Sequence, residues 1–161
     1  MILIIGNNFS NYILLDLLEE AGEKAKIINL SHSLMEDLNG LAPEALILAL
    51  SNQDLEQSNI CFNLLSKLGP RLPILGIGLG HLAIGNFYGA QIKPNSSVMH
   101  GKVSHIYHDG KGVYKNLPTP FPATRYDSFV IDKNSLPPHI QTVSCSEDGE
   151  VMGIRHLYYP I

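Results

Sequence analysis

The stretch LPILGIGLGHLAIGNFYG, residues 72–89, decides the expected fold. An apolar run over residues 72–77 enters a tight turn over residues 76–80, and a helix rich in small residues is expected to follow. Enzymes use a strand, a sharp turn and a helix in this order to hold a nucleophile at the start of the helix. At the tip of this turn stands Gly78, which has no side chain.

The glycine spacing in this turn excludes two common phosphate-binding loops. A dinucleotide-binding loop requires G-x-G-x-x-G, but the third glycine position is occupied by His81. The Gly-Lys-Ser/Thr ending of a phosphate-binding P-loop is absent. Glycines two residues on either side of Gly78 fit a nucleophile elbow best. The other interpretation, which the pattern leaves open, is that the glycines only allow the helix to pack closely on the strand.

Before this stretch, apolar strands alternate with amphipathic helices. The expected strands cover residues 2–5, 26–30, 45–50 and 73–77. The first helix is expected to be capped by Ser10 or Asn11 and to bury Leu14, Leu17, Leu18 and Ala21 before it stops at Gly22. Further helices are expected over residues 54–68 and after Gly80. This order predicts an α/β fold, with a largely parallel central sheet and helices on both faces.

The second half of the chain is predicted to be rich in β-structure. After Gly89 the helical periodicity gives way to short strands over residues 103–107, 127–131, 141–145 and 151–155, separated by turn sequences. We see no linker or repeat. We therefore expect residues 1–161 to form a single domain.

The composition excludes several classes of partner. The chain has 161 residues and a net charge of −4, with no basic stripe, so we expect no nucleic acid to bind. No apolar run approaches the roughly 20 residues of a membrane span, and the start MILIIGNN lacks the features of a signal peptide. Cys61 and Cys145 are expected to be free thiols, so we predict a cytoplasmic protein.

Four long segments carry a resemblance to a known family. They are PILGIGLGHLAIGNFYGAQI (73–92), MHGKVSHIYHDGKGVY (99–114), LPTPFPATRYDSFVID (117–132) and EDGEVMGIRH (147–156). Together they resemble class I glutamine amidotransferases, and above all the small subunits of anthranilate synthase and aminodeoxychorismate synthase. The resemblance implies a flavodoxin-like fold, glutamine hydrolysis by a Cys-His-Glu triad, and transfer of ammonia to a larger subunit that uses chorismate. It implies no cofactor.

Measured against the family's pattern, the site residues differ. The family elbow reads G-x-C-x-G-H-Q, so Gly78 stands at the cysteine position and Leu82 at that of the glutamine. Ser51, Asn52 and Gln53 fall where the family has the S-P-G-P-G oxyanion loop. In the second half, Ser128 and Phe129 match the pair that contacts glutamine, after an Asp127 where many relatives carry His. These positions are expected to be vestiges of a glutamine site.

The end of the chain also differs from the family pattern. The sequence stops at Tyr159-Pro160-Ile161, just before the G-V-Q-F-H-P-E strand that carries the histidine and glutamate of the triad. We therefore expect a truncated C-terminus. The missing strand and helix are expected to leave apolar surface exposed, so that the chain associates with itself or is marginally stable.

Other residues that could supply chemistry are better explained by structure. Cys61 lies in a helix on a core pattern, and Cys145 lies in a late strand with no histidine nearby in the sequence. A metal could be considered at His100, His105, His108 and Asp109. However, His105 and His108 would point to opposite faces of one strand, so we expect no metal.

The sequence therefore predicts a degenerate amidotransferase-like subunit that cannot hydrolyse glutamine. Its expected role is to dock on a chorismate-using synthase. Glycine at position 78 would relieve the strain of the elbow once catalysis is lost. The alternative is a working amidotransferase component of tryptophan or folate synthesis, if the sequence is incomplete or altered.

Overall fold

The computed structural model describes residues 1–6, 8–31, 33–51, 58–97 and 99–161. The chain divides into two compact units, each described by itself. The first contains Met1–Phe87 and Tyr159–Ile161, and the second contains Tyr88–Tyr158. The prediction that residues 1–161 form one domain stays a prediction.

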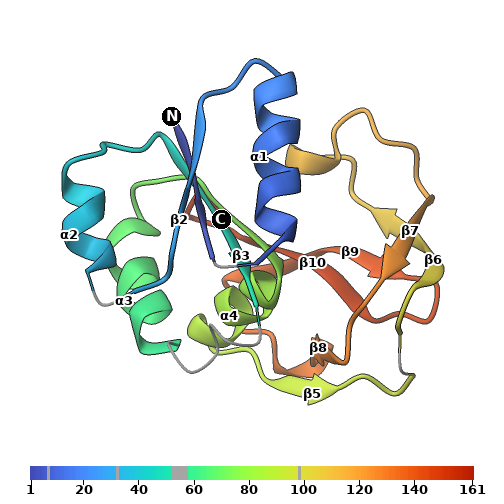
Figure 1. The fold of residues 1–161 in the computed structure, drawn as a ribbon. Coiled ribbons are helices and arrows are strands. Elements are labelled where there is room, and N and C mark those ends of the chain that lie inside the picture. Colours follow the sequence, from blue (N-terminus) through green and yellow to red (C-terminus); the bar gives the residue numbers. More distant parts are fainter. Residues whose placement is uncertain (7, 32, 52–57, 98) are drawn as a thin grey trace. The chain divides into compact units, whose positions relative to one another are not determined.

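The first unit is a parallel α/β sheet. Its strands are β1 (Ile2–Ile5), β2 (Ala25–Ile28), β3 (Ala45–Leu50) and β4 (Ile74–Gly78), in the order β2-β1-β3-β4. Its helices are α1 (Ser10–Glu20), α2 (Leu34–Asn39), α3 (Ser58–Leu68) and α4 (Leu79–Phe87). Figure 1 shows α1 on one side of the strands and α2 and α3 on the other. The predicted parallel sheet with helices on both faces is confirmed.

Continuous apolar strands build the core of this unit, because a parallel sheet is buried on both faces. On one face, Leu14, Leu15 and Leu18 of α1 pack against Ile4 and Ile47. Other residues of the core are fully buried: Leu3, Ile5, Leu46, Leu48, Leu64 and Leu65. This core holds the carboxyl ends of the strands in place, where a site in an open α/β sheet is expected.

Four details of the first unit differ from the sequence prediction. The N-cap of α1 is Phe9, without a side-chain hydrogen bond, so Ser10 and Asn11 are helical residues and not caps. Leu17 is exposed, although its spacing placed it on the buried face. The short helix α2 was not predicted, and α4 begins at Leu79, one residue before Gly80.

The second unit is an antiparallel sheet. Its strands are β5 (Ile92–Pro94), β6 (Lys102–His108), β7 (Phe121–Arg125), β8 (Phe129–Ile131), β9 (Ile140–Ser146) and β10 (Val151–His156), in the order β5-β8-β10-β9-β6-β7. Two 3₁₀ turns, η2 (Gly112–Tyr114) and η3 (Lys133–Ser135), lie between strands. The predicted β-rich second half is confirmed. The sequence did not predict β5 and β7, which both contain a proline.

A buried ionic group stabilises this second sheet. Arg125 is 4% exposed, and its guanidinium donates hydrogen bonds of 3.0 Å and 2.7 Å to the two carboxylate oxygens of Asp127. Asn95 donates to the same carboxylate at 2.7 Å, and Arg125 Nη1 reaches Ser104 Oγ at 3.4 Å. The hydrogen bonds that Arg125 donates to Asp127 raise the pKa of Arg125 above its usual value, so its guanidinium stays charged.

A second buried contact depends on a glycine. The hydroxyls of Tyr114 and Ser144 lie 2.8 Å apart. A Cβ atom on Gly153 would stand 2.5 Å from both of these oxygens, so only glycine leaves room for the pair. The ladder between β9 and β10 is also irregular around Gly153. Within the described ranges, no helix has the length and apolar character needed to cross a membrane.

Candidate functional site

The turn between β4 and α4 has the backbone of an elbow. Gly78 is the last residue of β4, and its φ of 57° lies in the left-handed region that side chains rarely adopt. The helix α4 starts at the next residue, so its first backbone N–H groups follow the tip directly. The sequence prediction of a strand, a sharp turn and a helix at residues 74–87 is confirmed.

The three glycines of this turn serve two different purposes. A Cβ atom on Gly80 would lie 1.9 Å from the backbone oxygen of Leu48 in β3. A Cβ atom on Gly76 would lie 2.6 Å from Cδ1 of Ile84. Both flanking glycines are therefore required by close packing of strand and helix. A Cβ atom on Gly78 would have no neighbour within 4 Å among the described residues, so only the backbone conformation favours glycine there. The packing interpretation therefore applies to Gly76 and Gly80, whereas at Gly78 the glycine serves the backbone conformation of the elbow.

His81 lies at the start of α4 and places a buried polar atom at the turn between β4 and α4. Its Nε2 atom is buried and has no hydrogen-bond partner in the part of the chain that the structure describes. Burial lowers the pKa of His81 to about 4, so the imidazole is neutral at pH 7. A neutral imidazole can donate from one ring nitrogen and accept at the other.

Two asparagines carry further unpartnered groups just after β1. Asn8 Nδ2 donates to the backbone oxygen of Ala49 at 2.9 Å, while Asn8 Oδ1 is buried without a partner among the described residues. Asn11 is fully buried, and neither polar atom of its amide has a partner there. Gly6 makes room for this arrangement, since its Cβ would meet the backbone oxygen of Ala49 at 2.2 Å.

The buried, unpartnered side-chain atoms of the described residues share one location. They belong to Asn8, Asn11 and His81, which follow the carboxyl ends of β1 and β4. Because parallel strands end at the same edge of a sheet, these groups and Gly78 lie on one edge. The chain order reverses between β1 and β3, the topological switch point at which ligands of such folds bind. We take this carboxyl edge as the candidate site.

Sequence reasoning missed Asn8 and Asn11 as members of the site. The signal was present, because polar residues that directly follow a buried strand stand at its carboxyl edge. Buried polar groups are normally hydrogen-bonded, so the unpartnered ones mark the place where a bound molecule or water completes the structure. The edge can therefore donate and accept hydrogen bonds, but Gly78 supplies no nucleophile.

The other sequence-predicted site residues are only partly brought together. Ser51 follows β3 directly, at the same edge, whereas Asn52 and Gln53 lie outside the described residues. Leu82 lies in α4, one residue after His81. Ser128 and Phe129 belong to the second unit and are described within it alone. There, the backbone oxygen of Ser128 accepts from Asn95 N at 2.9 Å, and Phe129 opens β8 with an exposed ring.

The two cysteines lie in unlike surroundings. Cys61 is buried in α3, and burial raises the pKa of its thiol to about 11. A thiol with this pKa is protonated at neutral pH and is a poor nucleophile. Cys145 is half-buried in β9 of the second unit. Both are free thiols, as predicted.

The histidines considered for a metal have other partners. His105 Nδ1 lies 3.3 Å from a carboxylate oxygen of Glu147, and His108 Nε2 lies 2.9 Å from the backbone oxygen of Pro118. Asp109 accepts from Arg155 at 2.7 Å, which lowers the pKa of Asp109. Over the described ranges, no three His, Cys, Asp or Glu side chains gather as a metal site would require.

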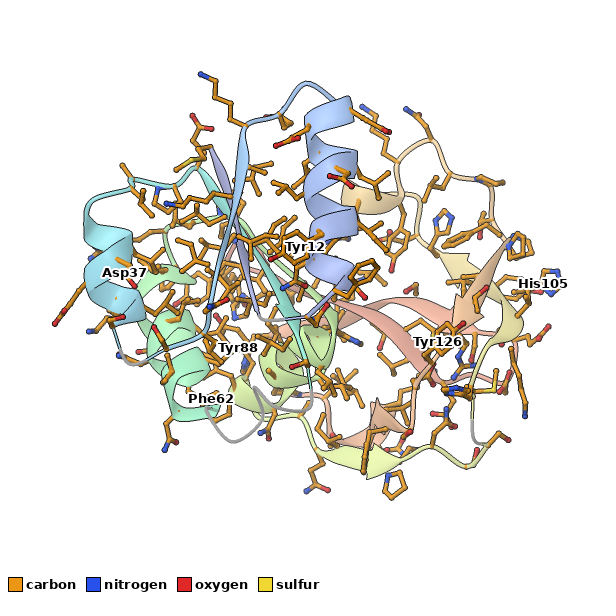
Figure 2. All side chains as sticks on the ribbon, in the orientation of Figure 1. Tyr12, Asp37, Phe62, Tyr88, His105 and Tyr126 are labelled. Carbon is orange, nitrogen blue, oxygen red and sulfur yellow. The ribbon has the colours of Figure 1, made fainter. Side chains whose placement is uncertain are left out.

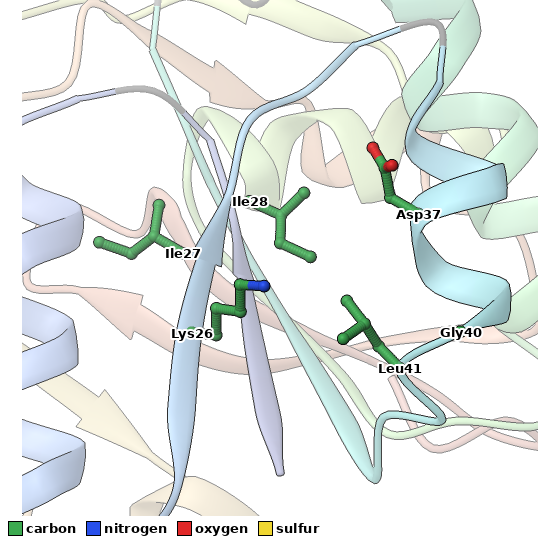
Figure 3. Close-up of a pocket in the computed structure, with 6 residues that line it drawn as sticks. All are labelled: Lys26, Ile27, Ile28, Asp37, Gly40 and Leu41. Atoms are coloured by element: carbon green, nitrogen blue, oxygen red, sulfur yellow. The ribbon is translucent and has the colours of Figure 1, made fainter.

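A hollow of about 400 Å³ lies beside β2, the outermost strand of the sheet on the side away from β4. It is lined by Lys26, Ile27 and Ile28 of β2 and by Asp37, Gly40 and Leu41 in and after α2. Figure 3 shows the Lys26 and Asp37 side chains on opposite sides of it. The hollow is open to solvent and carries few polar groups, so it offers less chemistry than the carboxyl edge.

The parallel sheet, the glycine elbow and the polar carboxyl edge define an α/β protein whose candidate site lies at a strand–helix elbow. The family model for glutamine amidotransferase class-I matches residues 4–161. The chain therefore belongs to the class-I glutamine amidotransferase family. The resemblance predicted from the sequence is confirmed at this level.

Two curated relatives illustrate this membership, and one solved structure shares the fold. Anthranilate synthase component 2 of Cyanophora paradoxa is 38% identical over 160 residues, which is 99% of this chain and 84% of the relative. Aminodeoxychorismate synthase component 2 of Klebsiella aerogenes is 35% identical over 162 residues, covering 100% of this chain and 87% of the relative. A crystal structure assigned as a GMP synthase subunit from Thermoplasma acidophilum superposes with a TM-score of 0.83 at 19% identity, covering 99% of this chain and 80% of that one. This last similarity confirms the flavodoxin-like amidotransferase fold.

Proposed function

We propose that this chain is the small, amidotransferase-type subunit of a chorismate-using synthase. The observation that carries the proposal is similarity over the whole chain, at 38% and 35% identity, to two proteins named as component 2 of such synthases. A component 2 acts together with another component. The proposed partner is therefore the larger, chorismate-using subunit.

Two candidate functions differ in whether the chain hydrolyses glutamine. The names of the relatives favour a working amidotransferase component, in line with the family to which the chain belongs. Gly78 supports the other candidate, a subunit that docks without hydrolysing glutamine. Hydrolysis through a covalent intermediate requires a nucleophilic atom at the tip of the elbow, and glycine has none. Cys61, with its raised pKa, is a poor substitute.

The docking part of the proposal is tested by co-expression. The untagged chain is produced together with a tagged chorismate-using large subunit from the same organism, and the complex is isolated on the tag. Co-purification in a fixed ratio is expected. If the two chains separate, and ammonia-dependent synthase activity is unchanged by the small chain, the docking proposal is wrong.

The hydrolysis part is tested on the same complex. Glutamate release from glutamine is measured for the native chain and for Gly78→Cys, which places a thiol where the Cβ has open space. No release is expected from the native chain. A glutamine-like diazoketone, which alkylates a thiol near a bound glutamine, should label Gly78→Cys but not the native chain if a glutamine site survives. Glutamate release by the native chain would instead establish the working amidotransferase.

We also infer that copies of the chain associate through β4. In the described sheet β4 is an edge strand whose first residue, Ile74, donates its backbone N–H to the oxygen of Pro160 at 2.9 Å. Beyond Ile74, the Leu75 and Ile77 side chains of β4 are exposed. An exposed apolar edge strand is a template for pairing with another strand. Light scattering after gel filtration should give a dimer for the native chain and a monomer for Ile77→Lys. A monomeric native chain at micromolar concentration would contradict this inference.

A further inference from the structure

The helix α1 is apolar on two sides, although only one side packs on its own sheet. Leu14, Leu15 and Leu18 face the core. On the outer side, Phe9, Tyr12, Ile13 and Leu17 are exposed by 81%, 60%, 51% and 56%. We call these four residues the outer α1 stripe. An amphipathic helix normally buries its apolar residues on one face, so the apolar residues outside that face leave α1 with surface for a second contact.

The stripe is continuous along the helix. Phe9, Ile13 and Leu17 follow one another at intervals of four residues, so their side chains lie one above the other on a single face. Tyr12, labelled in Figure 2, directly precedes Ile13 in the helix and is also exposed. Contiguous apolar surface of this kind marks a site of interaction with another protein, whereas single exposed apolar residues need no explanation.

The charges around the stripe indicate which partner fits. Asp16, Glu19 and Glu20 are exposed on α1, and the sequence of the helix, SNYILLDLLEE, contains no Lys or Arg. If two copies met through this face, a two-fold axis would bring carboxylates against carboxylates. A surface that complements the stripe is therefore apolar and rimmed by Lys or Arg.

The stripe also begins at the candidate site. Phe9 follows Asn8, whose amide donates to Ala49 at the carboxyl edge of the sheet. A protein that covers Phe9 would therefore border that edge and could exchange a small molecule with it.

We propose that the outer α1 stripe is the surface on which the synthase subunit docks, through an apolar groove rimmed by basic residues. This inference rests on the proposed function. It adds the location of the interface and the chemistry of the partner surface.

The test is a binding measurement between the purified full chain and the chorismate-using large subunit. The double variant Ile13→Lys/Leu17→Lys places two cations in the stripe and should weaken binding at least tenfold. The matched control is Val103→Lys, which also puts a lysine at an exposed apolar position, 61% exposed on β6, and should bind like the native chain. Circular dichroism and the melting temperature show whether each variant is folded.

A second variant tests the charge argument without changing the apolar residues. Asp16→Lys/Glu20→Lys should slow association about tenfold at low salt, and the difference from the native chain should shrink at high salt. Unchanged association rates would overturn the predicted basic rim.

The outcomes separate the two proposals. If the native chain does not bind the large subunit, both the proposed function and this inference fail. If it binds, and the stripe variant binds equally well or the Val103→Lys control loses as much affinity, only the location on α1 is wrong. If the stripe variant instead converts a homodimer to a monomer and leaves the large-subunit complex intact, the occupant is a second copy and this inference is overturned.

Discussion

The two units of the molecule differ in whether their buried polar side chains have hydrogen-bond partners. In the antiparallel unit, the buried Arg125 is held by Asp127 and Ser104, and the buried Ser144 is paired with Tyr114. In the parallel unit, the amide of Asn11 and one ring nitrogen of His81 are buried without partners among the described residues. An unpartnered buried group costs about 1–3 kcal/mol of folding stability. Such groups are therefore expected mainly at functional sites.

We therefore expect a ligand to bind in the parallel unit, whereas the buried polar groups of the antiparallel unit contribute to stability. Among the described residues of the antiparallel unit, every buried side-chain nitrogen and oxygen has a hydrogen-bond partner. The parallel unit leaves donors and acceptors at the edge where its elbow lies, which is where a bound molecule would satisfy them. Four experiments can break or sharpen this contrast, taken from the largest expected effect to the smallest.

Asp127→Ala should cause the largest loss of stability. It removes the main partner of Arg125. Among the described residues, the buried guanidinium then keeps Ser104 and the more distant carboxylate of Asp148, 3.8 Å away. Breaking a buried ion pair in this way costs about 3–5 kcal/mol. Denaturant unfolding of the native chain and the variant gives the difference.

The control for this experiment is Glu147→Ala, which removes the exposed partner of His105. An exposed polar contact of this kind contributes at most about 1 kcal/mol, so little change is expected. Equal losses for the two variants would show that the antiparallel unit does not depend on its buried network.

Gly80→Ala and Gly78→Ala test the two purposes of the elbow glycines. Gly80→Ala drives a methyl group into the backbone of Leu48 and should cost about 3 kcal/mol, at the upper end of overpacking effects. Gly78→Ala meets open space and should cost only the strain of a positive φ, about 1–2 kcal/mol. Thermal unfolding compares the two, and the reverse order would refute the assignment of packing to Gly80.

His81 should make stability depend on pH. Its pKa is about 4 in the folded chain, below the usual 6.5, so the unfolded chain takes up a proton first as the pH falls. Stability is therefore complete above pH 6.5 and is lost on the way down to pH 4, by about 2 kcal/mol between pH 7 and pH 4.5. Urea unfolding at several pH values should show this loss in the native chain and a smaller one in His81→Gln. Parallel pH profiles would place His81 in contact with water.

The smallest effects differ in sign between the units. Asn11→Leu replaces an unpartnered buried amide with an apolar side chain of similar shape and should stabilise the chain by about 1 kcal/mol. Tyr114→Phe removes the hydroxyl that pairs with the buried Ser144 hydroxyl and should destabilise the chain by about 1 kcal/mol. If Asn11→Leu destabilises the chain, the Asn11 amide has a bound partner such as an internal water.

Local patterns in the sequence predicted much of the first unit. The strands β1 and β3 match the predicted residues because continuous apolar runs of four to six residues have few alternative structures. The elbow was predicted because part of its glycine spacing reflects a contact within a few residues, between Gly76 and Ile84. In α1 the same reasoning failed at Leu17, because a helix that is apolar on both sides has no single buried face to identify.

The rest depends on contacts that are distant in the sequence. The strand β7 contains Pro122 and exists because it pairs with β6, so its own sequence signal is weak. The Arg125–Asp127 pair is close in the sequence, but its burial comes from Ser104 and Asn95 on other segments. In the site, Asn8 resembled an ordinary turn residue, and only the register of β1 against β3 brings it to Ala49.

The open space around Gly78 makes the elbow a natural attachment point. A Cβ atom introduced there meets none of the described residues within 4 Å, so the substitution costs only the strain of the turn. In Gly78→Cys, a thiol-directed fluorophore should react at this position well before the buried Cys61, whose pKa is about 11. Such a reporter would signal the arrival of any molecule at this corner, whether or not a reaction follows.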